Sequence, residues 1–495
     1  MLGVPRIAPR EVIFSAMMLA IFIVAVEATI VATAMPTIVS DLGGLRYFSW
    51  VFGAYLLTQT ITIPIYGRLA DFFGRKVLLM VAIGIFLTGS ILCGFAHDMF
   101  ALILFRALQG IGAGGVQPVA STIVGDLYQG RDRARVQGVL STTWAFAAVI
   151  GPLLGAFLIA RFGWPVIFWI NVPVGLGCVA IVVNPYRENI ARVAHRIDYA
   201  GSLLLAIGVG TLMYVLVMAG NMPLEPAVLS ACGAAVALAV LMWHETRAAE
   251  PMIPLSLYGI RVIAIANAGN FIVGAMMMGI TVFLPTFIQG AMGRSAVVAG
   301  SVLGAVFIGW MCGSNGGARA QLRFSYRVIA VAASIFVVIG SASLTLMDAG
   351  SNLTGVYAGM VLLGLGFGSL NSVYVVSTQA AVTWEQRGAA TSSLVFMRQI
   401  GSAIGSAAFA AVFNTGIYGR IPDAGRTVAR LVDPEQRRRI PTLDLARDAS
   451  AIAQSLHGVY VILFCLAAVI GALVFTLPRH LRAAHAVQPQ GVQTG

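Results

Sequence analysis

The sequence predicts an all-α integral membrane protein with 14 transmembrane helices: two six-helix pseudo-repeat bundles and two helices inserted between them. Composition, a series of apolar runs and a weak internal repeat support this prediction. Of the 495 residues, 59% are hydrophobic and 10% are charged, whereas an ordinary soluble domain is about 25% charged. The mean hydropathy is +0.89. Soluble domains of this total length need more charge on their surfaces, so lipid must be the solvent for most of the chain.

The same composition excludes a soluble enzyme and a disordered scaffold. The net charge of +12 fits the basic cytoplasmic loops of a membrane protein better than nucleic-acid binding. Lys76 is the sole lysine and precedes Val77, so the chain cannot contain a G-x-x-x-x-G-K-[ST] phosphate loop. The five cysteines stand singly in apolar runs and are expected to be small buried hydrophobes. Neither they nor the six histidines show metal-ligand spacing.

The membrane spans follow from the apolar runs, since each span needs about 20 mostly apolar residues. In chain order the runs are 12–38, 50–66, 77–96, 100–124, 136–159, 166–183, 200–219, 226–243, 262–289, 296–313, 328–347, 354–378, 389–413 and 456–477. The first run is too long for a cleaved signal peptide and contains a carboxylate. An even number of spans places both termini on the same side of the membrane.

Lysine and arginine positions predict the orientation. With the N-terminus inside, 19 of them lie in cytoplasmic segments and three lie in short external loops, at Arg46, Arg161 and Arg294. The external loop 414–455 contains seven more, together with five acids, but long translocated loops follow the positive-inside rule less tightly. Both termini are therefore expected in the cytoplasm.

Two pairs of similar segments indicate an internal repeat. Residues 35–37 (Met-Pro-Thr) resemble 284–286 (Leu-Pro-Thr), and 110–114 (Gly-Ile-Gly-Ala-Gly) resemble 364–368 (Gly-Leu-Gly-Phe-Gly). The copies are eight spans apart, which makes the repeats parallel. Paired repeats with a site between them are a common transporter plan, although glycine-rich helices also resemble one another because small residues permit close packing.

The repeat predicts the domain organisation. The N-terminal bundle covers 12–184 and the C-terminal bundle covers 262–477, with the external loop 414–455 inside the second. The two inserted spans lie in 200–243. The remaining segments are all cytoplasmic: the N-terminus 1–11, the linkers 185–199 and 244–261, and the tail 478–495.

Glu27 is the carboxylate that the sequence singles out. It lies about 15 residues into the first apolar run, so roughly 22 Å from its start at a helical rise of 1.5 Å per residue. Acids such as Asp41, Asp98 and Asp348 lie near span ends. An ionisable group in mid-membrane is expensive and is a functional candidate, since it can exchange a proton for a substrate. A structural glutamate permanently paired with arginine is the alternative.

The segment 67–76, Gly-Arg-Leu-Ala-Asp-Phe-Phe-Gly-Arg-Lys, joins the second and third spans. Its glycines permit a tight turn, and its aspartate can pair with a nearby arginine. The spacing resembles the signature loop of the major facilitator superfamily. Residues 104–110 resemble that family's helix 4 motif, and 151–155 (Gly-Pro-Leu-Leu-Gly) resemble its antiporter motif. Residues 27–37 and 164–173 resemble the branch of fourteen-helix drug:proton antiporters.

The resemblance covers nearly the whole chain and implies roles for several residues. Glu27 and Arg106 would couple transport to protons. The implied cytoplasmic gate consists of Gly67, Arg68, Asp71, Gly74, Arg75, Lys76 and Asp126, and the implied antiporter hinge consists of Gly151, Pro152 and Gly155. Ordinary helix packing is the alternative for the hinge, and a solvated acid is the alternative for Asp126.

Two features depart from the family pattern. The usual helix 1 acid is aspartate, whereas this chain has Glu27, which places the carboxylate one methylene further out. The second half often has a degenerate copy of the signature loop, but residues 313–327 contain arginines and no acid. A symmetric cytoplasmic latch is therefore not expected.

Polar and aromatic residues within the spans are candidates for substrate contact. Each can instead serve interhelical hydrogen bonding or the core, since pockets use few polar groups. The candidates are Tyr55, Gln59, Trp144, Asn270, Trp310, Asn371, Tyr374, Gln379 and Arg398. For Arg398 the alternative is a snorkelling anchor to backbone carbonyls or lipid headgroups.

We expect proton-driven export of amphipathic or lipophilic compounds, including drugs, across the bacterial cytoplasmic (inner) membrane. The proton gradient is the energy source, and no cofactor or metal is expected. The expected partners are a small amphipathic substrate, protons and the bilayer, without nucleic acid; an envelope partner subunit is left open. A lipid, siderophore or anionic biosynthetic product is an alternative cargo, and a non-transporting membrane receptor is an alternative of another class. An enzyme is not expected, because no nucleophile–base set is visible.

Overall fold

The structure is a computed structural model in which every regular element of the described residues is a helix. The described residues are 10–128, 143, 146–147, 150–183, 198–218, 222–248, 251, 255–348, 350–383, 386–421 and 423–478. Within these residues, twelve helices are long and apolar enough to cross a membrane, and two shorter apolar helices cover Ile150–Phe162 and Val166–Val182. The protein is thus a multi-pass membrane protein.

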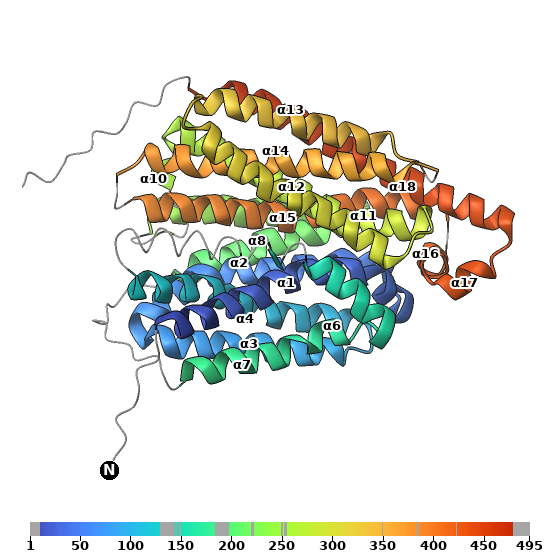
Figure 1. Ribbon diagram of the computed structural model, residues 1–495, viewed down its shortest axis with the longest axis horizontal. Coiled ribbons are helices and arrows are strands. Elements are labelled where there is room, and N and C mark those ends of the chain that lie inside the picture. Colours follow the sequence, from blue (N-terminus) through green and yellow to red (C-terminus); the bar gives the residue numbers. More distant parts are fainter. Residues whose placement is uncertain are drawn as a thin grey trace, which may run out of the picture.

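The helices form two halves joined by a pair of helices (Figure 1). The N half comprises α1 (Arg10–Leu42), η1 (Leu45–Tyr47), α2 (Phe48–Phe73), α3 (Arg75–Gly94), α4 (Met99–Leu127), the helix Ile150–Phe162, α6 (Val166–Trp169) and α7 (Asn171–Val183). The C half comprises α11 (Arg261–Thr286), η2 (Phe287–Ala291), α12 (Ala296–Ala320), α13 (Tyr326–Thr345), α14 (Leu353–Ala380), α15 (Arg387–Tyr418), α16 (Ala424–Val432), α17 (Pro434–Arg438) and α18 (Thr442–Phe475). Between them, α8 (Tyr199–Val217) packs on α2 and α15, and α9 (Leu224–Glu245) packs on α8. The four-residue α10 (Leu255–Tyr258) precedes α11.

The two glycine-rich segments make equivalent contacts in the two halves. On α4, the first and last glycines of 110–114 lie against α2 and the middle one lies against α3; on α14, the glycines of 364–368 lie in the same way against α12 and α13. A methyl group on any of these six glycines would collide with the neighbouring helix. The repeated pattern therefore permits close helix packing, and it does so symmetrically.

The halves are closed against each other at the end of the molecule that contains α16, called here the α16 end. The ring of Phe48 on α2 lies 5.3 Å from that of Phe283 and 6.1 Å from that of Phe413, both in the C half. Asn414 donates to the carbonyl of Arg46 at 3.0 Å. Further from this end, Gln399 of α15 donates to Gln59 of α2 at 3.2 Å.

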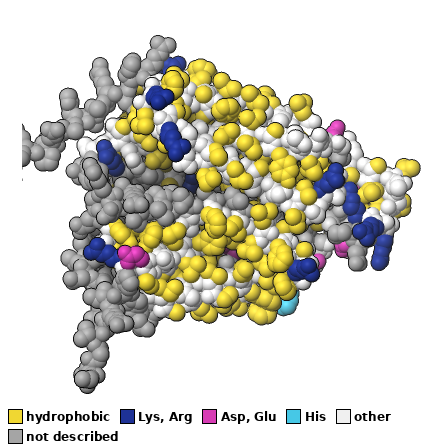
Figure 2. Space-filling model, in the orientation of Figure 1, with side chains coloured by type: hydrophobic (Ala, Val, Ile, Leu, Met, Phe, Trp, Pro, Cys, Tyr) yellow, Lys and Arg dark blue, Asp and Glu magenta, His cyan; other side chains and the backbone are white. Residues whose placement is uncertain are grey.

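The face shown in Figure 2 is largely apolar where it is described, with Lys and Arg side chains near both ends. Large hydrophobic side chains such as Phe100, Leu203 and Leu229 are exposed, as expected of residues that face lipid tails. The prediction that all five cysteines are buried is wrong. Cys93 and Cys178 are buried, but the other three lie on the exposed faces of α9, α12 and α18. In a bilayer, an apolar run does not imply burial within the protein.

Several helices are longer than the apolar runs that predicted them. The last span is predicted over 456–477, but α18 begins at Thr442 and ends at Phe475. Its first turns contain Asp444, Arg447 and Asp448, so the helix extends beyond the apolar run. The external loop predicted over 414–455 correspondingly shrinks to the segment between α15 and α18, where α16 and α17 form. Much of the predicted span 136–159 lies outside the described residues.

Candidate functional site

Glu27 and Arg106 form an ion pair inside the N half. Nη1 of Arg106 lies 2.6 Å from Oε1 of Glu27, and the side chains are 1% and 0% exposed. The two residues are 79 positions apart in the chain. Glu27 is in the middle of α1, among the buried residues Ala25, Val26 and Thr29, and Arg106 is on α4.

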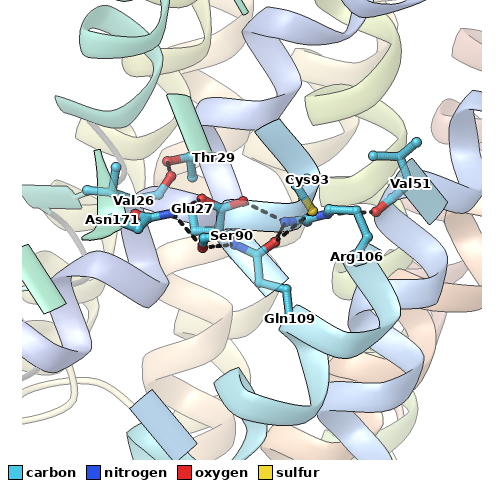
Figure 3. A network of polar contacts seen from close by, with 9 residues as sticks. All are labelled: Val26, Glu27, Thr29, Val51, Ser90, Cys93, Arg106, Gln109 and Asn171. Carbon is cyan, nitrogen blue, oxygen red and sulfur yellow. Dashed lines mark hydrogen bonds and ion pairs between the residues drawn. The ribbon is translucent and has the colours of Figure 1, made fainter. Parts of the chain in front are cut away.

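Three further side chains extend this pair into a polar network (Figure 3). Asn171 donates to Oε2 of Glu27 at 2.6 Å, and Arg106 donates to Oε1 of Gln109 at 2.6 Å. Gln109 in turn donates to Oγ of Ser90 at 2.7 Å, and Asn171 donates to the same oxygen at 3.2 Å. These side chains come from α1, α3, α4 and α7, so the network ties four helices together.

Arg106 has two more partners on α2. Its Nε donates to the carbonyl of Val51 at 3.0 Å, and its guanidinium lies 4.1 Å from the ring centroid of Tyr55. Tyr55 is one of the residues predicted to contact substrate. It is 1% exposed, and its ring is part of the surroundings of Arg106.

The sequence pattern missed three members of the network: Ser90, Gln109 and Asn171. Gln109 and Asn171 lie in the segments that resemble family motifs, 104–110 and 164–173. The resemblance was not used to give either residue a role. A usable signal was present, because each is a polar residue within an apolar run. Such residues need hydrogen-bond partners inside a membrane protein.

The predicted gate segment 67–76 is mostly helical: residues 67–73 end α2, Gly74 forms the turn, and Arg75 and Lys76 begin α3. Gly74 has a φ of +97° in this turn. Residues with a side chain rarely adopt this backbone conformation, whereas glycine does so at little cost. Arg75 and Lys76 begin α3 and are partly buried, and Gly67 is exposed. The side chains of Arg68, Asp71 and Asp126 lie outside the described residues, so the gate stays a prediction.

The predicted antiporter hinge packs against both halves. A side chain at Gly151 would overlap Thr29 of α1, and one at Gly155 would lie 2.6 Å from Thr33 Oγ1. The carbonyl of Pro152 lies against Gly300 of α12, where an added Cβ would come within 2.7 Å of it. The segment 151–155 is thus held between α1 and the C half, and Thr29 is one helical turn or less from Glu27.

The remaining predicted substrate residues are dispersed. Gln59 pairs with Gln399 across the halves, Gln379 donates to Thr391, and Asn270 donates to its own helix at Ala266. Trp310 lies 6.2 Å from the ring of Phe367.

Three other candidates complete the set. Tyr374 is buried against Gly269; its hydroxyl has no partner among the described residues. Asn371 is partly buried, and Trp144 lies outside the described residues. Two surface cavities, of about 490 and 390 Å³, lie between α15 and α18 and among α12, α13 and α14. Neither cavity is lined by a predicted substrate residue.

Arg398, the last candidate, lies in α15 and differs from Arg106. Its backbone packs against Gly274 of α11, and its side chain is largely but not completely buried. Within the described part of the chain, no hydrogen bond or ion pair is formed by its guanidinium.

The Major Facilitator Superfamily model matches residues 17–406. The chain belongs to this superfamily. Multidrug transporter protein MdtP of Bacillus subtilis (strain 168) is 32% identical over 453 residues, which cover 91% of this chain and 81% of that protein. Multidrug resistance protein 3 of the same organism is 31% identical, with 95% of each chain covered.

Solved structures of this superfamily share the fold. A bacterial homologue of the human lysosomal transporter Spinster, inward-facing and unoccupied, superposes with a TM-score of 0.67 at 17% identity and covers 96% of this chain and 97% of its own. A D-xylose–proton symporter superposes with a TM-score of 0.63 at 13% identity, covering 95% and 98%. This member of the superfamily is a membrane transporter and not an enzyme.

Proposed function

We propose that this transporter exports amphipathic or lipophilic compounds, drugs among them, in exchange for protons. It would do so from the bacterial cytoplasmic membrane, with 14 spans and both termini in the cytoplasm. The multidrug names of two relatives that match over nearly the whole chain support this cargo class. The two shorter apolar helices, added to the twelve longer ones, support the number of spans.

The ion pair of Glu27 and Arg106 is the observation that carries proton coupling. Protonation of Glu27 would remove the counter-ion of a guanidinium that is 1% exposed. The Gln109 amide and the Val51 carbonyl would remain as partners, but both are neutral. Breaking a buried pair from one side costs about 3–5 kcal/mol, because it leaves an uncompensated charge. Proton binding therefore disfavours this arrangement of α1, α4 and α7 and favours another.

Coupling on this scheme is indirect. Because Glu27 is 0% exposed, a substrate cannot displace its proton by direct contact in this conformation. The hinge glycine Gly151 packs on Thr29 of the same helix, which gives α1 a mechanical link to the face that meets the C half. A proton and a substrate would then act on one two-state equilibrium from different sites.

The closure at the α16 end supports a conformation for the transporter within this proposal. In the predicted orientation the α16 end would face outward, so the described conformation would be closed to the outside. Substrate would load from the cytoplasmic side with Glu27 ionised, and release would follow a rearrangement that opens the ring contacts of Phe48 with Phe283 and Phe413.

The test uses the full-length protein in proteoliposomes with an imposed pH gradient and ethidium as the probe. Wild type should accumulate ethidium. In Glu27→Gln the rate of gradient-driven ethidium uptake should fall at least tenfold, while ethidium binding is retained. Glu11→Gln changes an exposed carboxylate on the same helix and is the matched control. Undiminished gradient-driven uptake by Glu27→Gln would refute coupling at this residue. Binding by wild type without any uptake would favour a receptor.

A further inference from the structure

Arg398 lies deep in the membrane region, on the helix α15 that packs against α2 of the N half. It follows Arg387, the first residue of α15, by 11 positions, or roughly 16 Å along the helix axis. That is about half of the 30 Å hydrocarbon thickness of a bilayer. The next residue, Gln399, donates to Gln59 of the N half. A single side chain is too short to carry the charge from this depth to a headgroup, which argues against a snorkelling role.

The side chain of Arg398 is partly exposed, on a helix that packs against α2, α8, α11, α14 and α18. Because these neighbours limit the access of lipid to α15, a small molecule entering between the halves would be the ligand that meets this guanidinium. Arg106, at 1% exposure, is sealed inside the N half and cannot be reached.

The charges of the described membrane interior do not balance. Glu27 and Arg106 neutralise each other, whereas Arg398 has neither an ion-pair nor a hydrogen-bond partner among the described residues. An unpaired charge at this depth is expensive and indicates a functional group with a transient partner. An arginine recognises a carboxylate through two parallel charge-assisted hydrogen bonds, which is the strongest neutralisation available.

We propose that Arg398 binds the anionic group, a carboxylate or sulfonate, of an amphipathic substrate at the interface between the halves. The inference rests on the proposed export function and adds amphipathic anions, bound at a subsite of their own, to its cargo. Anion binding would supply the missing counter-charge, and the apolar body of the substrate would lie among the surrounding helices. Cation binding at this position is disfavoured because it would place two like charges in a medium of low dielectric constant.

The experiment compares three probes that share one apolar body: 4-(1-pyrenyl)butyrate, 4-(1-pyrenyl)butanol and 4-(1-pyrenyl)butyltrimethylammonium. Binding to the full-length protein is measured by pyrene fluorescence in nanodiscs of zwitterionic lipid. Wild type should bind the butyrate at least tenfold more tightly than the butanol, and the ammonium probe most weakly. Arg398→Gln should lose the preference for the butyrate while keeping the affinity for the butanol. Arg398→Lys should retain part of the preference, since it keeps the charge but not the planar fork.

Arg319→Gln is the matched control, because Arg319 is exposed near the end of α12, and it should leave all three affinities unchanged. Equal wild-type affinity for butyrate and butanol, an undiminished preference in Arg398→Gln, or no binding of any probe would each overturn the inference. The ethidium assay separates the two proposals. If ethidium is transported in response to the gradient but the butyrate is not preferred, only the inference about Arg398 is wrong. If the butyrate binds at Arg398 but no transport occurs, the proposed export function is wrong.

Discussion

At the scale of single residues, the buried charges show how a membrane protein accommodates ionised groups. Arg106 has an anionic partner in Glu27, neutral acceptors in Gln109 and Val51, and the ring of Tyr55. Each contact replaces hydration that the bilayer cannot supply. The pair thus holds four helices together, and it is sensitive to the protonation of one carboxylate. Structural and coupling roles are compatible here, because the same contacts serve both.

A double-mutant cycle measures how strongly these two charges depend on each other. Arg106→Gln should lower the free energy of unfolding by about 3–5 kcal/mol, because it leaves Glu27 buried without its counter-ion. The double variant Glu27→Gln with Arg106→Gln should be less destabilised than Arg106→Gln alone, since no unpaired charge remains. Thermal unfolding in detergent, followed by tryptophan fluorescence, gives the ranking. A purely additive cycle would contradict the pairing.

At the scale of elements, α16 and α17 form a cap over the end of the bundle. The buried face of α16, Ala424, Val428 and Leu431, packs against α1 of the N half and against η2 and α18 of the C half. The polar composition of the loop 414–455 points to no chemistry, and a short surface helix and a flexible chain are equally compatible with it. The three apolar side chains, spaced at three and four residues, are what bury the helix.

Arg437 fastens this cap to the π-helical end of α11. Its Nη1 donates to the carbonyls of Gly290 at 2.7 Å, Leu431 at 2.9 Å and Gln289 at 3.3 Å. Carbonyls at a helix end lack partners in their own helix, so one guanidinium satisfies several of them. Burial lowers the pKa of Arg437, although an arginine stays protonated in proteins. Gly293, with a φ of +64°, lies where a side chain would meet the guanidinium.

Removing this guanidinium tests the cap. Arg437→Gln should lower the free energy of unfolding by about 1–3 kcal/mol, because buried carbonyls lose their donor. Arg438→Gln, one position on and exposed, should change it by less than about 0.5 kcal/mol. Thermal unfolding of the two purified variants beside wild type gives the comparison. Equal stability of the two variants would show that Arg437 does not hold the cap.

At the scale of the whole molecule, three rings hold the halves together at the α16 end. Phe48 of the N half contacts Phe283 and Phe413 of the C half, whose rings lie 5.6 Å apart. Aromatic pairs of this kind add about 0.5–1.5 kcal/mol beyond the area that they bury. The proposed transport cycle would require these contacts to break, so they would belong to only one of its two conformations.

Phe283→Ala should therefore shift the population toward the form that is open at the α16 end. A cysteine at Ser49, which is 1% exposed beside Phe48, reports the opening in a background whose five native cysteines are replaced. If the closed form loses about 1.4 kcal/mol of stability relative to the open form, the rate at which a hydrophilic maleimide labels this cysteine should rise about tenfold. Phe287→Ala is the control, because Phe287 pairs with Tyr460 within the C half. Equal labelling rates in the two variants would argue against the ring contacts as the closure.

The apolar runs and the isolated charges determined much of this protein locally. Burial in lipid favours a helix wherever about 20 apolar residues follow one another, so the order of helices is readable from the chain. A carboxylate among such residues stands out for the same reason, which is why the amino-acid sequence alone makes Glu27 a candidate, whereas Arg106 becomes one through the family resemblance. The helix ends are harder to predict from the sequence, because charged turns such as those that begin α18 continue the helix beyond the apolar run.

Only the tertiary structure decided which partners those residues have. The sequence holds two intramembrane arginines and one glutamate, and nothing local distinguishes Arg106 from Arg398 as the partner of Glu27. The choice depends on how α1 and α4 pack, across 79 residues of chain. The same holds for Asn171, Gln109 and Ser90, and for Tyr55, a candidate for substrate contact whose ring lies 4.1 Å from the guanidinium of Arg106. Hydrophobicity is a property of a segment, whereas pairing is a property of a packed interior, and the second cannot be computed from the first.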